Sequence, residues 1–111
     1  SQQSAINQKN KSSEQYYISN NGNDNNDGSE GSPWKTISHA VNQVTSGTIH
    51  VASGIYSESV VLKKSGTSDE YITLLGDGGA VIDGSFGYNN ADYGLLTVLN
   101  ASYVIIDNIT V

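Results

Sequence analysis

Cysteine is absent from the 111 residues, and the chain has one proline and no arginine. The lack of cysteine excludes disulfides, thiolate zinc sites and cysteine nucleophiles. No apolar run approaches the length of a membrane span, and no basic segment followed by an apolar one marks a signal peptide, so we expect no membrane partner. Five lysines stand against eleven acidic residues, and the net charge of −6 argues against nucleic acid as a partner.

Three segments of the chain differ in composition. Residues 1–15 are polar and aperiodic, and we expect them to form a flexible leader. Residues 16–47 combine a short β-prone run, a loop rich in Asn, Asp and Gly, and one amphipathic helix. Residues 48–111 alternate short strand-like runs with turn residues. The predicted order is therefore a leader, an N-terminal capping region, and a series of short strands.

The loop at residues 19–28 consists of side chains that favour turns. Asn23, Asn25 and Asp27 match the first alternating positions of a calcium-binding loop. The match fails at the twelfth position, which is Trp34 where a bidentate Glu should close the coordination sphere. We therefore expect Asx turns that fold this loop onto its own backbone.

One helix is predicted, and it begins at Ser32 and Pro33. Ser32 can cap the free N–H groups, and Pro33 suits the first helical position. The apolar positions that follow at helical spacing are Trp34, Ile37, Ala40, Val41 and Val44. Residues 45–47 end the helix. His39 lies off the apolar stripe and is expected to face solvent.

Short strand-like runs make up the rest of the chain. They are residues 48–51, 59–62, 71–75, 80–83, 95–99, 103–107 and 109–111. Ile49, Ile72 and Leu96 recur at intervals of 23 and 24 residues. A parallel β-helix needs such a period, because each coil, meaning one complete turn of the chain, lays its strands beside those of the coil before. A sandwich or barrel would instead need tight two-residue turns, so the pattern favours an all-β parallel β-helix.

Several motifs resemble one family of proteins. They are residues 17–28, Ser32-Pro33-Trp34-Lys35-Thr36-Ile37, Gly54-Ile55-Tyr56-Ser57-Glu58 and residues 96–107. Together they resemble the start of secreted right-handed parallel β-helix proteins of the pectate-lyase-like superfamily, which includes polysaccharide lyases of family nine. The resemblance implies a right-handed solenoid whose N-terminal end is closed by the helix. It also implies a secreted or cell-surface bacterial protein with a polysaccharide partner.

The chain stops inside the strand-like run at residues 109–111. Only two to three coils are built by then, and about three repeats are usual for stability. We therefore expect a truncated solenoid, the N-terminal part of a longer protein. Its uncapped C-terminal coil is expected to allow self-association.

The resemblance implies an activity for the full-length protein. Lyases of this kind cleave acidic, pectin-like uronate polymers by β-elimination, in which calcium neutralises the carboxylate and a basic residue takes the proton. Those residues lie on later coils in the lyases, so we expect catalytic residues beyond Val111 and none within this chain. The alternative function is a non-catalytic carbohydrate-binding, adhesin or structural β-helix module.

Two acidic residues are candidate calcium ligands. Asp83 and Asp107 are 24 residues apart, one coil, and could stack at a strand end. Stacked carboxylates repel each other and attract a cation such as calcium. The alternative is that each is a turn residue bonded to local backbone.

Two aromatic residues are candidate substrate-binding groups. Tyr88 and Tyr93 lie in the longest insertion between strands, and exposed aromatic rings beside Asn and Asp suit sugar stacking. The alternative is a local cluster folded over the coil wall. Lys63 and Lys64 could meet an anionic sugar or form a solvated corner.

Two Asn residues fit the pattern of glycosylation acceptors, Asn100-Ala101-Ser102 and Asn108-Ile109-Thr110. In a β-helix, an Asn at a corner more often donates hydrogen bonds along the stack. We therefore expect a structural role for both.

Overall fold

The computed structural model describes residues 14–83 and 96–111. In chain order the elements of this part are β1 (Gln15–Ile18), α2 (Ile37–Gln43), β2 (Gly47–Val51), β3 (Gly54–Tyr56), β4 (Val60–Leu62), β5 (Ile72–Ile82), β6 (Leu96–Val98) and β7 (Val104–Thr110). Most of the expected leader, residues 1–13, lies outside the described part. Gln15, the last residue of the expected leader, begins β1.

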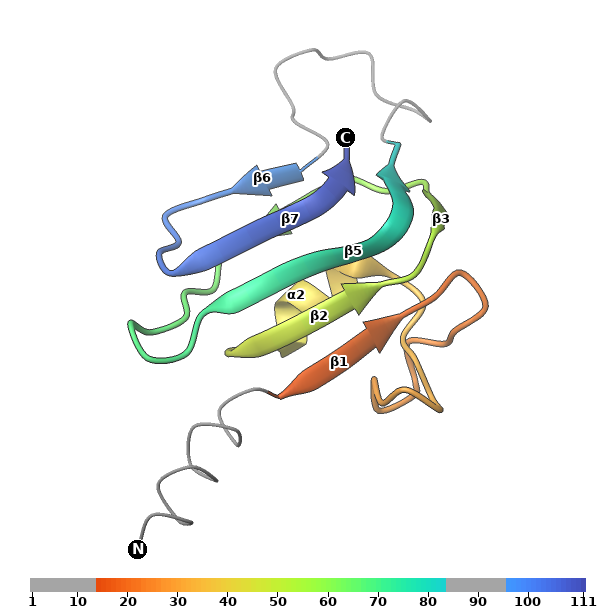
Figure 1. Cartoon of the computed structure of the whole chain (residues 1–111), viewed down its shortest axis with the longest axis horizontal. Helices are drawn as coiled ribbons and strands as arrows, with labels where there is room; N and C mark the ends of the chain where they lie inside the picture. Colours follow the sequence, from red (N-terminus) through yellow and green to blue (C-terminus); the bar gives the residue numbers. More distant parts are fainter. Residues whose placement is uncertain (1–13, 84–95) are drawn as a thin grey trace, which may run out of the picture.

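Every strand pairing in this part of the chain is parallel. In the larger sheet β1 pairs with β2, β2 with β5, and β5 with both β3 and β7, while β4 and β6 form a second sheet. Figure 1 shows β1, β2, β5 and β7 side by side, with β5 curling over at its end. Segments far apart in sequence thus stack as successive coils. This confirms the predicted parallel strands and the single helix among the described residues, and the sheet that these strands form is curled.

The register between coils differs from the predicted one. Ile49 pairs with Leu74, two residues beyond Ile72. Leu96 lies in the other sheet, where it pairs with Val60. Shifting a strand by two residues keeps the same side chains facing the core, so the apolar pattern alone could not choose between these registers.

Strand β5 replaces two predicted strands and the turn between them. Its burial alternates, and a register irregularity separates Leu75 from Ala80. Gly78 and Gly79 have φ angles of 106° and 85° there, which glycine adopts without steric cost. The strand therefore bends at its glycines instead of ending. Its first half lies beside β2 and its second half beside β3, a strand that the sequence pattern did not predict.

Helix α2 begins four residues later than predicted, at Ile37 instead of Pro33. Thr36 is its N-cap, and the Thr36 hydroxyl accepts from the His39 N–H. Trp34 is extended instead of helical, because its N–H donates to the Tyr17 carbonyl at 2.9 Å in a parallel bridge beside Ile18. The expectation that Ser32 caps the helix is therefore wrong, since pairing with β1 holds the following residues in an extended conformation.

The Asn/Asp/Gly loop folds as expected. Asn23 Oδ1 accepts from the Asn25 N–H at 2.8 Å, and Asp27 Oδ1 accepts from the Ser29 N–H at 3.0 Å. Both are Asx turns, in which a side chain bonds the backbone two residues on. The Trp34 indole N–H donates to a carbonyl of the same loop, which ties the loop to the core.

A single apolar core lies between the sheets and the helix. Its buried residues are Ile18, Trp34, Ile37, Ala40, Val41, Val44, Ile49, Val51, Tyr56, Val60, Leu62, Ile72, Leu74, Ala80 and Ile82. All the predicted apolar positions of the helical segment are among them. Helix α2 packs against β4 and β1, the first strands of the two sheets, and so covers the N-terminal end of the stack.

At the other end of the stack, the described residues leave apolar side chains exposed. Ile106 in β7 pairs with the fully buried Leu74, yet it is itself exposed, as are Val98, the last residue of β6, and Leu99 after it. None of the helices in the described part is long and apolar enough to cross a membrane.

Candidate functional site

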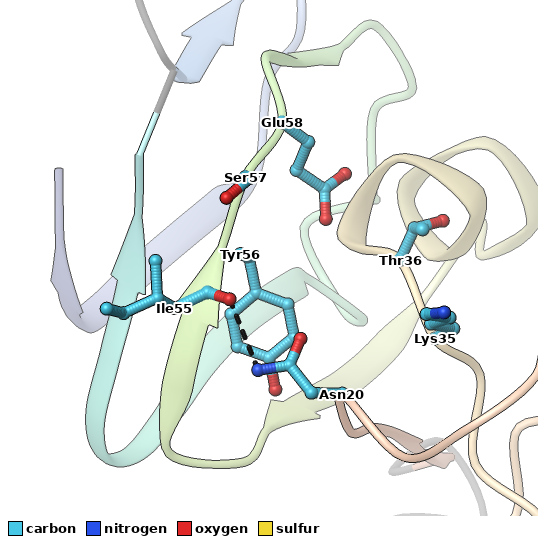
Figure 2. A pocket seen from close by; sticks show the side chains of 7 residues that line it. All are labelled: Asn20, Lys35, Thr36, Ile55, Tyr56, Ser57 and Glu58. Atoms are coloured by element: carbon cyan, nitrogen blue, oxygen red, sulfur yellow. Dashed lines mark hydrogen bonds between the residues drawn. The ribbon is translucent and has the colours of Figure 1, made fainter. Parts of the chain in front are cut away.

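A pocket of about 280 Å³ opens between helix α2 and strand β3 (Figure 2). Its lining residues are Asn20, Lys35, Thr36, Ile55, Tyr56, Ser57 and Glu58. They come from three places in the sequence: the loop after β1, the turn before α2, and β3 with the residues that follow it. The pocket therefore forms only when the first coil closes against the helix.

The turn before α2 is held by Asp24. One carboxylate oxygen accepts from the backbone N–H groups of Lys35 and Thr36, both at 2.9 Å, and the other accepts from the Thr36 hydroxyl at 2.8 Å. Burial raises the pKa of Asp24, but these hydrogen bonds, together with the charge of His39, outweigh it and hold the pKa below its ordinary value of 3.8. The ionised carboxylate thus fixes the wall of the pocket that carries Lys35.

Glu58 holds the opposite wall against the same helix. Its two carboxylate oxygens accept from the N–H groups of Ile37 and Ser38, each at 2.9 Å. These donors belong to the first turn of α2 and have no partner within the helix. Figure 2 shows the carboxylate directed at the start of the helix. Each oxygen keeps a second lone pair with which it can accept from a ligand.

Asn20 joins the loop to β3. Its side-chain amide donates to the Ile55 carbonyl at 3.2 Å, the dashed line in Figure 2. Gly54 allows this approach, because a Cβ there would come within 2.5 Å of the Asn20 amide nitrogen and its φ of 142° disfavours other residues. The side-chain oxygen of Asn20 can accept a hydrogen bond from a ligand.

Tyr56 closes the base of the pocket. Its ring is buried, and its hydroxyl donates to the Ala52 carbonyl at 2.7 Å. Burial, with smaller contributions from the charges of Glu58 and Asp77, raises the pKa of Tyr56 above its ordinary value of 10.0. The hydroxyl therefore stays protonated and serves as a structural donor.

The groups left to a ligand differ in their chemistry. Lys35 is exposed and forms no ion pair with any described residue. The hydroxyl of Ser57 is exposed, and the side chain of Ile55 is 62% exposed, a large value for an apolar residue. A cationic donor, a hydroxyl, amide and carboxylate acceptors and an apolar surface thus meet in a small volume. Such a mixture can bind a compact molecule that carries several hydroxyl groups.

The two predicted calcium ligands are not register partners. Asp107 pairs with Leu75, and Asp83 lies beyond the pairing of Val81 with Thr110. The Asp83 N–H donates to the Tyr56 carbonyl instead. No group of three or more His, Asp or Glu residues that could hold a metal ion occurs among residues 14–83 and 96–111. Calcium binding by this chain stays a prediction.

The other predicted residues fall into two groups. Tyr88 and Tyr93 lie outside the described residues. Lys63 and Lys64 are exposed on the connection between β4 and β5, away from the pocket lining. His39 is half-buried instead of solvent-facing, because its ring packs edge-on against Trp34 with centroids 5.2 Å apart.

Asn108, one of the two Asn residues predicted to lie at corners, behaves as expected. The Asn108 side-chain amide donates to the Gly76 carbonyl of the preceding coil at 3.0 Å. This hydrogen bond runs along the stack and gives the residue a structural role.

Sequence reasoning did not identify the pocket residues as a site. The motifs around Lys35 and from Gly54 to Glu58 were noted only as family features. The signal that could have found the site is the order of residues in β3 and just after it. There the exposed Ile55 and the acidic Glu58 lie on either side of the buried Tyr56. Their meeting with Lys35 depends on contacts across about twenty residues of sequence.

Three comparisons relate this chain to known proteins. A family model described as "Protein of unknown function (DUF1565)" matches residues 20–85, more than half of the chain. The uncharacterized protein YwoF of Bacillus subtilis (strain 168) is 37% identical over 59 residues, which cover 52% of this chain and 13% of YwoF. The matched segment is thus a small part of that longer protein.

A solved structure is similar as well. The structure of XylC in complex with xylose matches 62% of this chain and 11% of the XylC chain, with 32% identity and a TM-score of 0.58. The residues matched by the family model include all those that line the pocket. The chain is therefore a member of the DUF1565 family, within the broad superfamily of β-helix proteins.

Proposed function

We propose that this chain belongs to a carbohydrate-binding β-helix protein and that the pocket between α2 and β3 binds a sugar unit. The observation that carries the proposal is the meeting of Lys35, Asn20, Glu58 and the exposed Ile55 around about 280 Å³. Sugars present hydroxyl groups and an apolar C–H face, which suit such a mixed lining. The likeness to XylC, a protein solved with xylose, supports the same class of ligand.

The charges favour a neutral sugar. Glu58 lines the pocket and Asp24 lies behind Thr36, while Lys35 is the one cation in the lining. The net charge of −6 also repels a polyanion. A pocket of this volume is at the small end of ligand sites, so it suits one sugar unit rather than several.

The experiment is a calorimetric titration of the chain with xylose, xylohexaose and hexagalacturonate. We expect binding of the neutral sugars to exceed that of the uronate. Lys35→Ala should weaken sugar binding about tenfold, because it removes a charged hydrogen-bond donor. The fold should not change in this variant, because it keeps the Lys35 backbone N–H that donates to Asp24.

Lys63→Ala is the matched control, since Lys63 is also an exposed lysine but lies outside the pocket lining. Affinity should be unchanged in this variant. Absence of binding by the unaltered chain, or equal losses in both lysine variants, would refute the proposal.

The finer proposals concern the whole protein. From the resemblance of its motifs to secreted β-helix lyases, we also propose that the whole protein is secreted or lies at the cell surface, and that it cleaves uronate polymers by calcium-assisted β-elimination. That activity is tested by following the ultraviolet absorbance of unsaturated product from pectate, chondroitin and alginate, with calcium and with a chelator, on a longer chain that continues past residue 111. If none of the three polymers yields the unsaturated product, the lyase activity is refuted and only the binding function stands.

A further inference from the structure

Two exposed tyrosines meet at the end of the strands opposite to the pocket. Tyr71 immediately precedes β5 and Tyr103 immediately precedes β7, and the residues after them, Ile72 and Val104, are register partners. The two rings pack edge to face, with centroids 5.5 Å apart and an interplanar angle of 75°. They are 41% and 45% exposed. The pair thus forms an aromatic corner on the surface.

The exposure of Tyr71 does not come from the open end of the stack. Its carbonyl accepts from the Gly47 N–H of the preceding coil at 3.0 Å, and the Ile72 N–H donates to the Tyr103 carbonyl of the next coil at 3.0 Å. Neighbouring coils therefore flank the backbone at Tyr71 on both sides, and its ring is nevertheless exposed.

The backbone around the pair is held in place. The Gly66 N–H donates to the Ser102 carbonyl at 3.1 Å, and the Ser102 N–H donates to the Ser65 hydroxyl at 2.9 Å. Tyr103 itself has a φ of 58°, a left-handed conformation that is an outlier for a bulky residue. Strain of this kind persists where surrounding contacts enforce it, and it clusters at ligand sites.

The left-handed backbone at position 103 does not require a tyrosine. Asn100 and Asn108 adopt the same left-handed conformation in this chain, at φ angles of 53° and 58°. Asn tolerates that conformation better than tyrosine does. An aromatic ring in the strained position, exposed and held rigidly against a second ring, is a surface prepared in advance for a ligand.

We propose that Tyr71 and Tyr103 form a second carbohydrate contact, in which a pyranose ring stacks on one phenol ring and bonds to the hydroxyls of the pair. Amphipathic rings with few rotatable bonds lose little entropy when they bind such a ligand. The class of ligand rests on the proposed function, whereas the location rests on the geometry of the pair. A glycan bound here would lie away from the pocket between α2 and β3.

The test compares xylohexaose affinity and urea stability for substitutions at the pair. Tyr103→Asn should lower the affinity about five- to tenfold. The same substitution should leave the stability unchanged or raised, because it relieves the left-handed strain. Tyr71→Ala should lower the affinity similarly, and Tyr71→Phe should lower it less because the ring remains. Val61→Ala, another exposed apolar position, is the control and should bind as the unaltered chain does.

The outcomes separate this inference from the proposed function. If Tyr103→Asn destabilises the chain and leaves the affinity unchanged, the pair is structural and the inference is overturned, while a loss in Lys35→Ala would still support the pocket. If the unaltered chain binds no xylohexaose, both proposals fail. Backbone amide shifts at residues 65–72 and 99–104 during the titration, in addition to shifts at the pocket, would support the location.

Discussion

At the scale of single residues, Asp24 has the largest set of hydrogen bonds around the candidate site. The Asp24 carboxylate accepts hydrogen bonds from two backbone N–H groups and from the Thr36 hydroxyl. All three donors favour the ionised carboxylate, which is why its pKa lies below the ordinary value although burial opposes this. The residue therefore links the pH of the solution to the stability of the turn before α2.

Stability should fall in acid partly through Asp24. A carboxylate whose pKa is lowered on folding contributes fully above its unfolded pKa, and the contribution disappears as the pH falls through the lower, folded value. Asp24→Asn should therefore be clearly less stable than the unaltered chain at about pH 7, and the difference should shrink toward about pH 2. Urea unfolding across this range measures it. Asp69→Asn, at an exposed position, is the control, and a difference independent of pH at Asp24 would contradict the explanation.

Gly76 lies where two coils approach each other closely. A Cβ at this position would overlap the Asn108 carbonyl oxygen of the next coil. Gly76→Ala should thus lower the free energy of unfolding by about 2 kcal/mol, because the coils must move apart. Gly31→Ala is a matched control with nothing within 4 Å of the added carbon, and it should change the stability by less than about 0.5 kcal/mol. Equal effects in urea titrations of the two variants would count against the observed register.

At the scale of elements, helix α2 depends on groups outside itself. It has only seven residues, too few to be stable alone in water. Thr36 caps it, Glu58 accepts from its first N–H groups, and its apolar side is buried against β4 and β1. The helix therefore forms together with the first coil.

The position of the cap can be tested directly. Thr36→Ala removes the hydroxyl that accepts from the His39 N–H and should cost about 1 kcal/mol, whereas Thr36→Ser should restore most of it. Ser32→Ala should be nearly neutral, because Ser32 lies before the extended Trp34 and does not cap the helix. Chemical unfolding of the three variants distinguishes the positions, and a larger loss at Ser32 would place the start of the helix where the sequence alone predicted it.

The sequence predicts the helix and strands correctly where the preferences of neighbouring residues decide the secondary structure. Runs such as residues 60–62 and 104–107 are strands because β-branched Val and Ile side chains favour the pleated sheet. The sequence does not predict the strand at Gly54–Tyr56, because three residues that begin with a glycine carry too little pattern. Among the site residues, Lys35 and Glu58 lie in motifs that were noted, but their common pocket was not predicted.

At the scale of the whole molecule, the two ends of the stack differ. Helix α2 covers the first strands, whereas β7 and β6 leave strand edges and apolar side chains exposed. Exposed parallel edges of this kind pair readily with another chain.

We expect the 111-residue chain to self-associate through this end, with a second copy as the partner. Sedimentation velocity should show a larger species as the concentration rises. Ile106→Lys should shift the equilibrium toward monomer, because it places a charge on the apolar side of β7. Val61→Lys should leave the equilibrium unchanged. Val61 is exposed, but it belongs to β4, the strand against which helix α2 packs at the covered end of the stack. A monomer at all concentrations would contradict the expectation.

The sequence by itself determined that the chain is built of short strands, that an Asx-turn loop precedes one amphipathic helix, and that successive strands return to the same wall. These features follow from side-chain size, turn preference and apolar spacing, which act over a few residues. The tertiary structure alone decided the register of Ile49 with Leu74, the start of the helix at Ile37, and the meeting of Lys35 with Glu58. Each of these depends on contacts between distant segments, and a shift of two residues or a change of cap leaves the local pattern unaltered.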